Sequence, residues 1–406
     1  MKDVTWVNML KLKASFGQQG NDDILFEGGY NIGVMRIEKN YYPWMDQYQL
    51  TGGNGVFSDG TLMAKGNPDL TWETSTSYNV GIDFALFGNR LNGTAEYFGR
   101  KSGDMLYNKP VAGSVGYTSM PMNVGSMTNS GFELDLTYQI FNRKNFSWDV
   151  NLNATFIKNK INKLHPDLKG VLIDGNYIYE EGESMYRMYL VDYAGVDPDN
   201  GEALYWAKDT DTGELYKTAN YAEAQTTNKV ATDNMMPKVY GGFGTSIEAF
   251  GFDASIQLSY QLGGKIFDSG YRYMMHNGDQ GGQNWHKDIY KAWTPDNRYT
   301  DVPRLNAQDR YSYSVSTRWL TSSNYLSINN ITVGYTLPSN WAKKLMLEKL
   351  RVYFTADNVG LLSARKGLDP RQSYTTDYHF IVYCNPYNLR WYQSLILINQ
   401  HISIDQ

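Results

Sequence analysis

Residues 132–156 read FELDLTYQIFNRKNFSWDVNLNATF, and this stretch decides the class of fold. On both sides of the polar turn at 142–145, apolar side chains occupy nearly every second position. Between Phe132 and Ile140 the alternate positions carry Glu133, Asp135, Thr137 and Gln139. Alternation with a period of two is the pattern of a β-strand with one apolar and one polar face. The stretch therefore predicts a hairpin of two such strands joined by a short turn.

The same alternation predicts further strands, at 77–86, 91–97, 252–260 and 350–357. Short turns, such as the one at 88–90, join consecutive strands. Between the hairpins lie connections of roughly 30, 80 and 60 residues, far above the usual loop length. Tight turns at one end and long loops at the other are typical of an outer-membrane barrel. We therefore expect an all-β fold, a partial antiparallel transmembrane β-barrel wall with short periplasmic turns and long extracellular loops.

The composition agrees with this class. The chain has 406 residues, of which 42% are hydrophobic, and it contains 33 Tyr and 10 Trp, as expected for aromatic girdles at a membrane interface. It has no apolar run long enough for a transmembrane helix. The formal net charge of −5 does not indicate a basic surface for binding nucleic acid. The single cysteine, Cys384, allows no disulfide framework and no thiolate metal site.

A soluble β-sandwich would also show alternating strands. The outer face of a sandwich is usually rich in Lys, Glu and Thr, whereas the polar faces predicted here carry mostly Asn, Ser, Gln, Thr, Asp and Glu and almost no Lys. This composition favours the barrel.

Several segments, in this order along the chain, resemble the SusC/RagA-like TonB-dependent outer-membrane transporters. They are 66–74 (GNPDLTWET), 123–133 (NVGSMTNSGFE), 195–201 (GVDPDNG), 237–243 (PKVYGGF), 260–265 (YQLGGK), 323–335 (SNYLSINNITVGY), 356–359 (ADNV) and 367–370 (GLDP). The resemblance as a whole covers roughly residues 5–378.

The resemblance implies the C-terminal portion of a barrel that is closed around an N-terminal plug. It also implies import of oligosaccharides or peptides across the outer membrane, driven by TonB through a part absent from this chain, with a SusD-like lipoprotein over the extracellular mouth. We expect residues 1–380 to be the barrel portion. The chain is expected to contain neither a plug domain nor a signal peptide, since 1–6 lack the charged and apolar regions of a leader.

Residues 381–406 form an atypical tail, because members of the resembled family end on an aromatic residue and this chain ends at Gln406. We expect the tail to be out of register with the ancestral reading frame. Ordinary C-terminal variation is the alternative.

Sites for metals, cofactors or catalysis are not expected. The segment 197–202 has the carboxylate spacing of half a calcium loop, but position 208 is lysine, so a turn is favoured. His276 and His286 are expected to be solvated loop residues. Glu96, Glu133, Asp135 and Asp149 are expected to line the lumen as polar groups, and the chain is not expected to be an enzyme.

Aromatic residues in the long connections are the candidate substrate-binding residues. Flat rings near Asn, Gln and Asp suit the faces and hydroxyls of sugars. The candidates are Trp206, Trp285, Trp293, Tyr271 and Tyr273. The alternative is that such rings pack the loops against each other and against the lid lipoprotein. For the whole chain, a soluble or surface-attached carbohydrate-binding module and a non-functional truncated remnant of the importer remain as alternatives.

Overall fold

The structure is a computed structural model that describes residues 5–22, 25–27, 37–39, 41–53, 56–117, 119–344 and 346–371. The tail at 381–406 lies outside these residues. Nine long strands form one antiparallel sheet in the order β1-β6-β7-β10-β11-β19-β20-β23-β24. They are β1 (Val7–Asn21), β6 (Glu73–Leu86), β7 (Leu91–Gly103), β10 (Gly125–Arg143), β11 (Phe146–Leu164), β19 (Val239–Ala249), β20 (Phe252–Leu262), β23 (Tyr325–Thr336) and β24 (Arg351–Ser363).

Shorter elements belong to the connections between these strands. Small sheets pair β2 (Leu25–Glu27) with β3 (Ile37–Lys39), β4 (Gln47–Gly53) with β5 (Val56–Ala64), β8 (Leu106–Pro110) with β9 (Ser119–Asn123), β12 (Val171–Asp174) with β13 (Tyr177–Glu180), β14 (Tyr189–Val191) with β18 (Lys229–Ala231), and β21 (Lys265–Phe267) with β22 (Leu320–Ser322). A three-stranded sheet holds β15 (Tyr193–Val196), β16 (Ala203–Lys208) and β17 (Leu215–Thr218). The helices are α1 (Tyr221–Thr227), α2 (Ser269–Met274), α3 (Ser339–Lys344) and the 3-10 turns η1 (Gly113–Val115), η2 (Pro166–Leu168), η3 (Lys287–Lys291) and η4 (Thr317–Trp319). Within the described residues, no helix is both long and apolar enough to cross a membrane.

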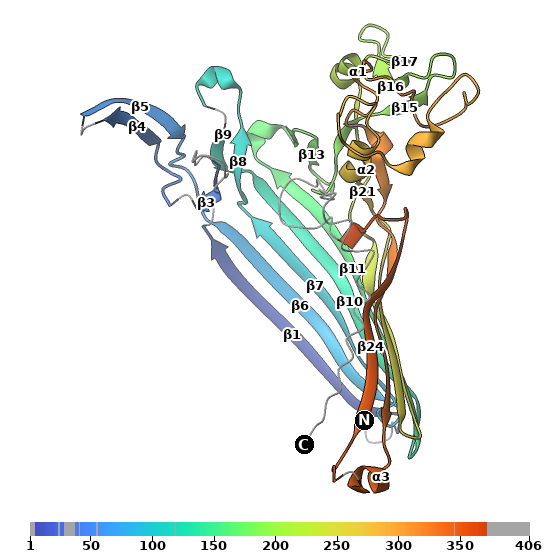
Figure 1. The fold of residues 1–406 in the computed structure, drawn as a ribbon. Helices are drawn as coiled ribbons and strands as arrows, with labels where there is room; N and C mark the ends of the chain where they lie inside the picture. The colour runs from blue at the N-terminus through green and yellow to red at the C-terminus, as the bar shows by residue number, and fades with distance from the viewer. Residues whose placement is uncertain are drawn as a thin grey trace.

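The nine strands form a tilted, curved wall with tight turns at one end and long connections at the other (Figure 1). The predicted hairpins β6–β7, β10–β11 and β19–β20 are confirmed. In the β6–β7 turn, Phe87, Gly88 and Asn89 all have positive φ, which explains the choice of Gly and Asn there. Several strands extend beyond the alternating segments, so that β10 and β11 each contain 19 residues.

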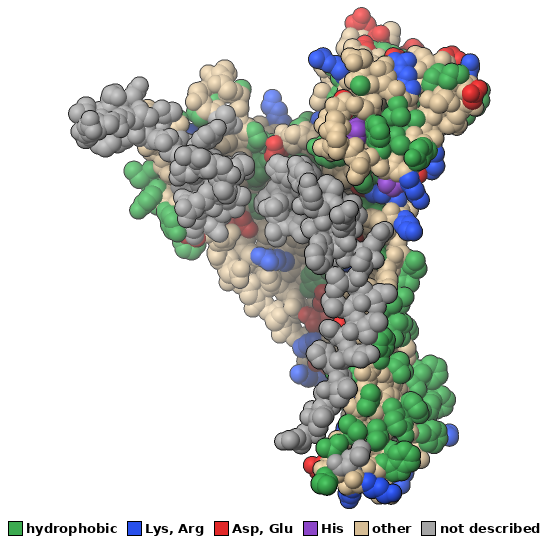
Figure 2. All heavy atoms as spheres, in the orientation of Figure 1, with side chains coloured by type: hydrophobic (Ala, Val, Ile, Leu, Met, Phe, Trp, Pro, Cys, Tyr) green, Lys and Arg blue, Asp and Glu red, His purple; other side chains and the backbone are tan. Residues whose placement is uncertain are grey.

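The apolar faces of the strands form one exposed band on the outside of the wall. Across five neighbouring strands the register places Leu12, Ile82, Ala95, Leu134 and Ala154 side by side. The side chain of Leu12 is 75% exposed. A contiguous exposed apolar surface of this kind marks contact with lipid. Figure 2 shows apolar side chains gathered along the outer contour of the lower wall, whereas the concave face is mostly polar.

Aromatic pairs lie close to the short turns. The pairs, with their ring-centre distances, are Trp6–Phe87 at 5.9 Å, Phe141–Trp148 at 6.1 Å and Phe252–Tyr335 at 4.4 Å. Aromatic rings collect at the membrane–water interface because one end of the side chain is apolar and the other tolerates water. The turn end of the wall therefore has the composition of a membrane interface.

The concave face carries charged and amide side chains. The Lys13 ammonium lies 3.0 Å from carboxylate oxygens of both Asp83 and Glu96. The alternation of the strands places Glu133, Asp135 and Asp149 on this same face, as expected from the sequence. Lys13 comes from β1, a strand that was not among those predicted from the sequence. The described residues thus form the wall of a β-barrel with a lipid side and a polar side; in them the sheet is open between β1 and β24.

Candidate substrate-contacting loops

The two longest connections, 165–238 and 263–324, fold against each other at the end of the wall opposite the short turns (Figure 1). We call them together the loop module. Their shared core contains Met188 and Leu190 from the first connection and Phe267, Met275, Ile289, Ala292, Val302 and Trp319 from the second. Leu190 is fully buried and Trp319 is 2% exposed. The loop module is therefore a packed unit with its own apolar core.

Hydrogen bonds join the same two connections. A parallel bridge pairs Val191 with Ser316, and the Tyr193 N–H donates to the Thr317 hydroxyl at 2.9 Å. That hydroxyl donates to the carboxylate of Asp192 at 3.0 Å. The contacts fix the position of one connection relative to the other.

A second core lies in the upper part of the loop module, around Tyr205 on β16. Its side chain is 1% exposed, and its hydroxyl donates to the backbone carbonyl of Tyr311 at 2.5 Å. The ring of Tyr221, on α1, meets Tyr205 edge-on at 5.2 Å. Burial raises the pKa of Tyr205 far above its usual value, so the hydroxyl stays protonated and available as a donor.

An ion pair fastens the loop module to the wall. Asp268 is 4% exposed, caps α2 through the Tyr271 N–H, and pairs with the guanidinium of Arg365, which follows β24. Arg365 also stacks over the Tyr271 ring at 4.4 Å. Burial, together with the nearby Asp288 carboxylate, raises the pKa of Tyr271 to about 12. The Tyr271 hydroxyl therefore remains a donor, and it reaches Asp288 at 3.1 Å.

Three of the predicted substrate-binding residues take part in packing within the loop module. Trp206 is half-buried on β16, with the Lys217 ammonium 5.2 Å from its ring centre. The Trp293 indole donates to the carbonyl of Pro198 at 3.1 Å. Tyr271 lies against Trp319 at 5.9 Å, in addition to its contact with Arg365.

The other two predicted residues present more open rings. Trp285 is 46% exposed and Tyr273 is 41% exposed. Trp285 stacks on His276 at 5.0 Å, and the Arg272 guanidinium lies 4.3 Å from the Tyr273 ring centre. The five predicted residues are thus spread over the loop module, with different degrees of exposure.

The expectation that His276 is a solvated residue is wrong. Its side chain is 1% exposed, because Trp285 covers one face of the ring and the Trp285 indole donates to the His276 carbonyl at 2.8 Å. The Nδ1 atom accepts from the Gly278 N–H at 3.2 Å. His286 is also largely covered, with 15% of its side chain exposed, and its ring meets Tyr271 edge-on at 4.9 Å. A glycine-rich sequence suggested an open loop, and only the packing of the rings shows otherwise.

The segment 197–202 is a turn, as expected. It joins β15 to β16, and the Asp197 N–H donates to the Glu202 carbonyl at 2.9 Å. The Gly201 N–H donates back to the Asp197 carbonyl at 2.8 Å, and Gly201 has a φ of 78°. Among the described residues, no cluster of three or more His, Cys, Asp or Glu side chains is arranged to hold a metal ion.

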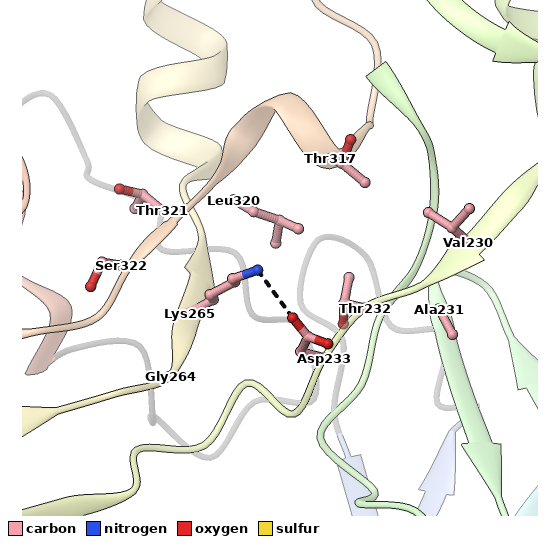
Figure 3. A pocket seen from close by; sticks show the side chains of 10 residues that line it. All are labelled: Val230, Ala231, Thr232, Asp233, Gly264, Lys265, Thr317, Leu320, Thr321 and Ser322. Carbon is pink, nitrogen blue, oxygen red and sulfur yellow. Dashed lines mark hydrogen bonds and ion pairs between the residues drawn. The ribbon is translucent and has the colours of Figure 1, made fainter. Parts of the chain in front are cut away.

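A cavity of about 480 Å³ lies between the two connections of the loop module. Figure 3 shows its lining from β18 on one side and from β21, η4 and β22 on the other, with Lys265 and Asp233 facing each other at 3.4 Å. A second cavity, of about 560 Å³, is lined by Pro198, Lys291 and Tyr299 among others. None of the five predicted aromatic residues lines either cavity. Selecting aromatic residues from the sequence therefore missed the residues that line these two cavities.

Strands with one lipid-facing side, tight turns at one end and long folded loops at the other define an outer-membrane β-barrel protein. The family model described as TonB dependent receptor-like, beta-barrel matches residues 6–359. The chain belongs to this family, whose members are proteins of the outer membrane.

Individual relatives of the chain support the same family. A TonB-dependent receptor of Formosa agariphila is 28% identical over 391 residues, which cover 93% of this chain and 37% of the relative. The TonB-dependent receptor SusC of Bacteroides thetaiotaomicron is 25% identical, over 91% of this chain and 36% of the relative. The solved RagAB peptide transporter matches with a TM-score of 0.74 and 27% identity, over 91% of this chain and 39% of the matched chain. The chain thus spans less than two-fifths of the length of these relatives, all of which are named as receptors or transporters.

Proposed function

We propose that this chain is part of a TonB-dependent importer of nutrients in the outer membrane, and that its substrates are oligosaccharides. A SusD-like lipoprotein would cover the loop module, and TonB would act through a part of the protein outside this chain. The observation that carries the proposal is the two-faced wall of nine strands with a folded loop module at its extracellular end. The soluble carbohydrate-binding module is disfavoured, because the outer apolar band would then face water.

Open aromatic rings support contact with sugars. Trp285 and Tyr273 each expose a large part of the ring. Polar groups lie between them in the chain: Asp279 accepts a hydrogen bond from the Tyr313 hydroxyl at 2.8 Å, and the Gln280 amide donates to the same hydroxyl at 3.2 Å. A flat apolar surface beside fixed polar groups suits a sugar ring and its hydroxyls. Trp206, Trp293 and Tyr271 are proposed to contact substrate elsewhere on the loop module or to support its loops.

A peptide is the second candidate substrate, because the RagAB transporter, to which the chain is similar in structure and sequence, carries peptides. Catalysis is not part of the proposal. The carboxylates on the concave face are assigned to polarity of the lumen, where Glu133 lies directly opposite Glu96 on the neighbouring strand.

Binding measurements on the protein purified from outer membranes in detergent test the proposal. Trp285→Ala combined with Tyr273→Ala should weaken oligosaccharide binding by roughly tenfold or more, since an aromatic contact is worth about 1 kcal/mol beyond its buried area. Trp341→Ala, on α3 at the opposite end of the wall, removes a ring that is even more exposed, at 63%, and should leave affinity unchanged. Calorimetric titration with an oligosaccharide panel and a peptide panel measures which class of substrate binds and how much the two rings contribute to its affinity.

Binding of peptides alone would overturn the sugar assignment and leave the importer intact. Unchanged affinity in the Trp285/Tyr273 double variant would remove these two rings from the site. Absence of binding to either panel would favour the non-functional remnant.

A further inference from the structure

The outward face of the wall changes from apolar to basic near its extracellular end. On β10 and β11 the register pairs Phe132 with Phe156, and the next two outward pairs are Ser130 with Lys158 and Thr128 with Lys160. Apolar lipid-facing positions are thus followed directly by two lysines on the same side of the sheet.

Asn159 shows independently that these two lysines point outward. It lies between them in the strand, is 3% exposed, and its amide donates to Asn129 at 2.7 Å. Its oxygen accepts from the Met185 N–H at 2.8 Å, so the side chain points toward the loop module. Because successive side chains of a strand lie on opposite faces, Lys158 and Lys160 lie on the lipid side.

Two further lysines complete the group. Lys101 of β7 pairs with Thr128 of β10 and therefore lies on the same outward face. One strand, β10, separates it from β11. Lys163, at the end of β11, pairs with Ser126. We call Lys101, Lys158, Lys160 and Lys163 the basic patch. All four are exposed, and none forms an ion pair with any described residue.

A surface hollow adjoins the basic patch. Its volume is about 490 Å³, and Lys101 and Lys163 line it together with hydroxyl and amide groups of Gln18, Thr76 and Ser126. Asp104 is the acidic residue among the lining side chains. Ammonium and hydroxyl donors around a hollow are the groups that hold phosphate oxygens.

The depth of the basic patch relative to the membrane follows from strand geometry. The outward apolar positions of β10 run from Phe132 to Ile140, about 27 Å along the strand at 3.4 Å per residue. With a strand tilt of about 40°, this run covers roughly 20 Å of membrane thickness, close to the height of the apolar band in such barrels. Lys158 and Lys160 lie one and two outward positions beyond it, at the level of the lipid headgroups.

We propose that the basic patch binds the phosphate groups of an anionic lipid in the outer leaflet. Its acyl chains would lie against the outward rings of Phe132, Phe156 and Tyr97, which continue from the basic patch into the apolar band. Clustered lysines at the membrane surface attract anionic headgroups, and each lysine near the surface contributes about fivefold in affinity. The inference rests on the outer-membrane location of the family and is independent of the transported substrate.

The test uses the protein purified from outer membranes in detergent and titrated with mixed micelles that contain lipid A, either bisphosphorylated or dephosphorylated. Binding should require the phosphates and should weaken by on the order of 100-fold or more when the four lysines are replaced together by glutamine. Four Lys→Arg replacements should retain binding, since the charge is kept. The matched control replaces Lys144, Lys343, Lys344 and Lys349, which are exposed at the turn end of the wall, by glutamine and should bind as the unmodified protein does.

Equal affinity for the two forms of lipid A would overturn the proposal, and this comparison needs no variant, so misfolding of the glutamine variant does not leave the question open. Loss of binding in the control variant would also overturn it, since the effect would then be one of net charge. Full competition by millimolar inorganic phosphate would assign the basic patch to free phosphate. Oligosaccharide binding measured on the glutamine variant should be unchanged, which separates this inference from the proposed import function.

Discussion

The facing of the strands makes a quantitative prediction at Leu136. This residue lies on the outward side of β10, flanked by Gly93 of β7 and Leu152 of β11. It is midway along the outward run from Phe132 to Ile140, so about 14 Å of strand separates it from either end. After the tilt of the strand this places Leu136 near the centre of the apolar band. An arginine at this depth costs about 2–4 kcal/mol.

The neighbouring residue provides a matched control. Thr137 is exposed on the concave face between Asn92 and Asn151, so Thr137→Arg places the same charge in polar surroundings. The effect there should stay within about 0.5 kcal/mol, as for surface substitutions in general. Urea unfolding of the protein in phospholipid vesicles, followed by tryptophan fluorescence, gives both free energies. Equal losses, or a larger loss for Thr137→Arg, would refute the assignment of the two faces.

Further predictions concern the loop module. Trp319→Ala should destabilise it by about 3–5 kcal/mol, because the ring is 2% exposed in the shared core, and hydrogen exchange should rise throughout both connections. Asp268→Asn keeps a helix cap but leaves Arg365 without its carboxylate; a loss of about 3 kcal/mol should appear as faster proteolysis of 263–324, and unchanged proteolysis would contradict the anchoring role. Burial lowers the pKa of His286 from its usual 6.5, so its contribution to stability is complete above that value and declines as the pH falls through the folded pKa. Proteolysis of the loop module should therefore accelerate between pH 7 and pH 5, and His286→Gln should remove His286's contribution to that acceleration.

Much of the wall could be predicted from the sequence, because alternation is a local property of a strand. The hairpin at 132–156 and the polar positions of Glu133 and Asp135 were found in this way and are confirmed. β1 was not assigned, although Leu10, Leu12, Ala14 and Phe16 take alternate positions in it. The alternating pattern of β1 was thus present in the sequence. This strand carries Lys13, which lies on the concave face beside Asp83 and Glu96.

The candidate substrate-binding residues were harder to predict from the sequence than the wall. Aromatic residues in long connections could be selected by type, but their exposure depends on what packs against them. Trp285 remains 46% exposed while Trp319, in the same connection, is 2% exposed. Trp285 covers His276, although the two residues are nine positions apart in the chain. No pattern of residue types distinguishes these cases.

The sequence by itself determined the class of fold, the two faces of the strands and the family, because each rests on residues that are close together in the chain. Only the tertiary structure decided how the loop module is built and which of its rings remain open. Its defining contacts join residues far apart, such as Tyr193 to Thr317, 124 positions away, and Asp268 to Arg365, 97 positions away. The position of the basic patch depends on both the sequence and the tertiary structure. Alternation sets the side on which Lys101, Lys158 and Lys160 lie, a register shift near the end of β11 places Lys163 opposite Ser126, and strand pairing across β7, β10 and β11 brings the four lysines together. Strand register is a long-range property, so it becomes visible only when the sheet has formed.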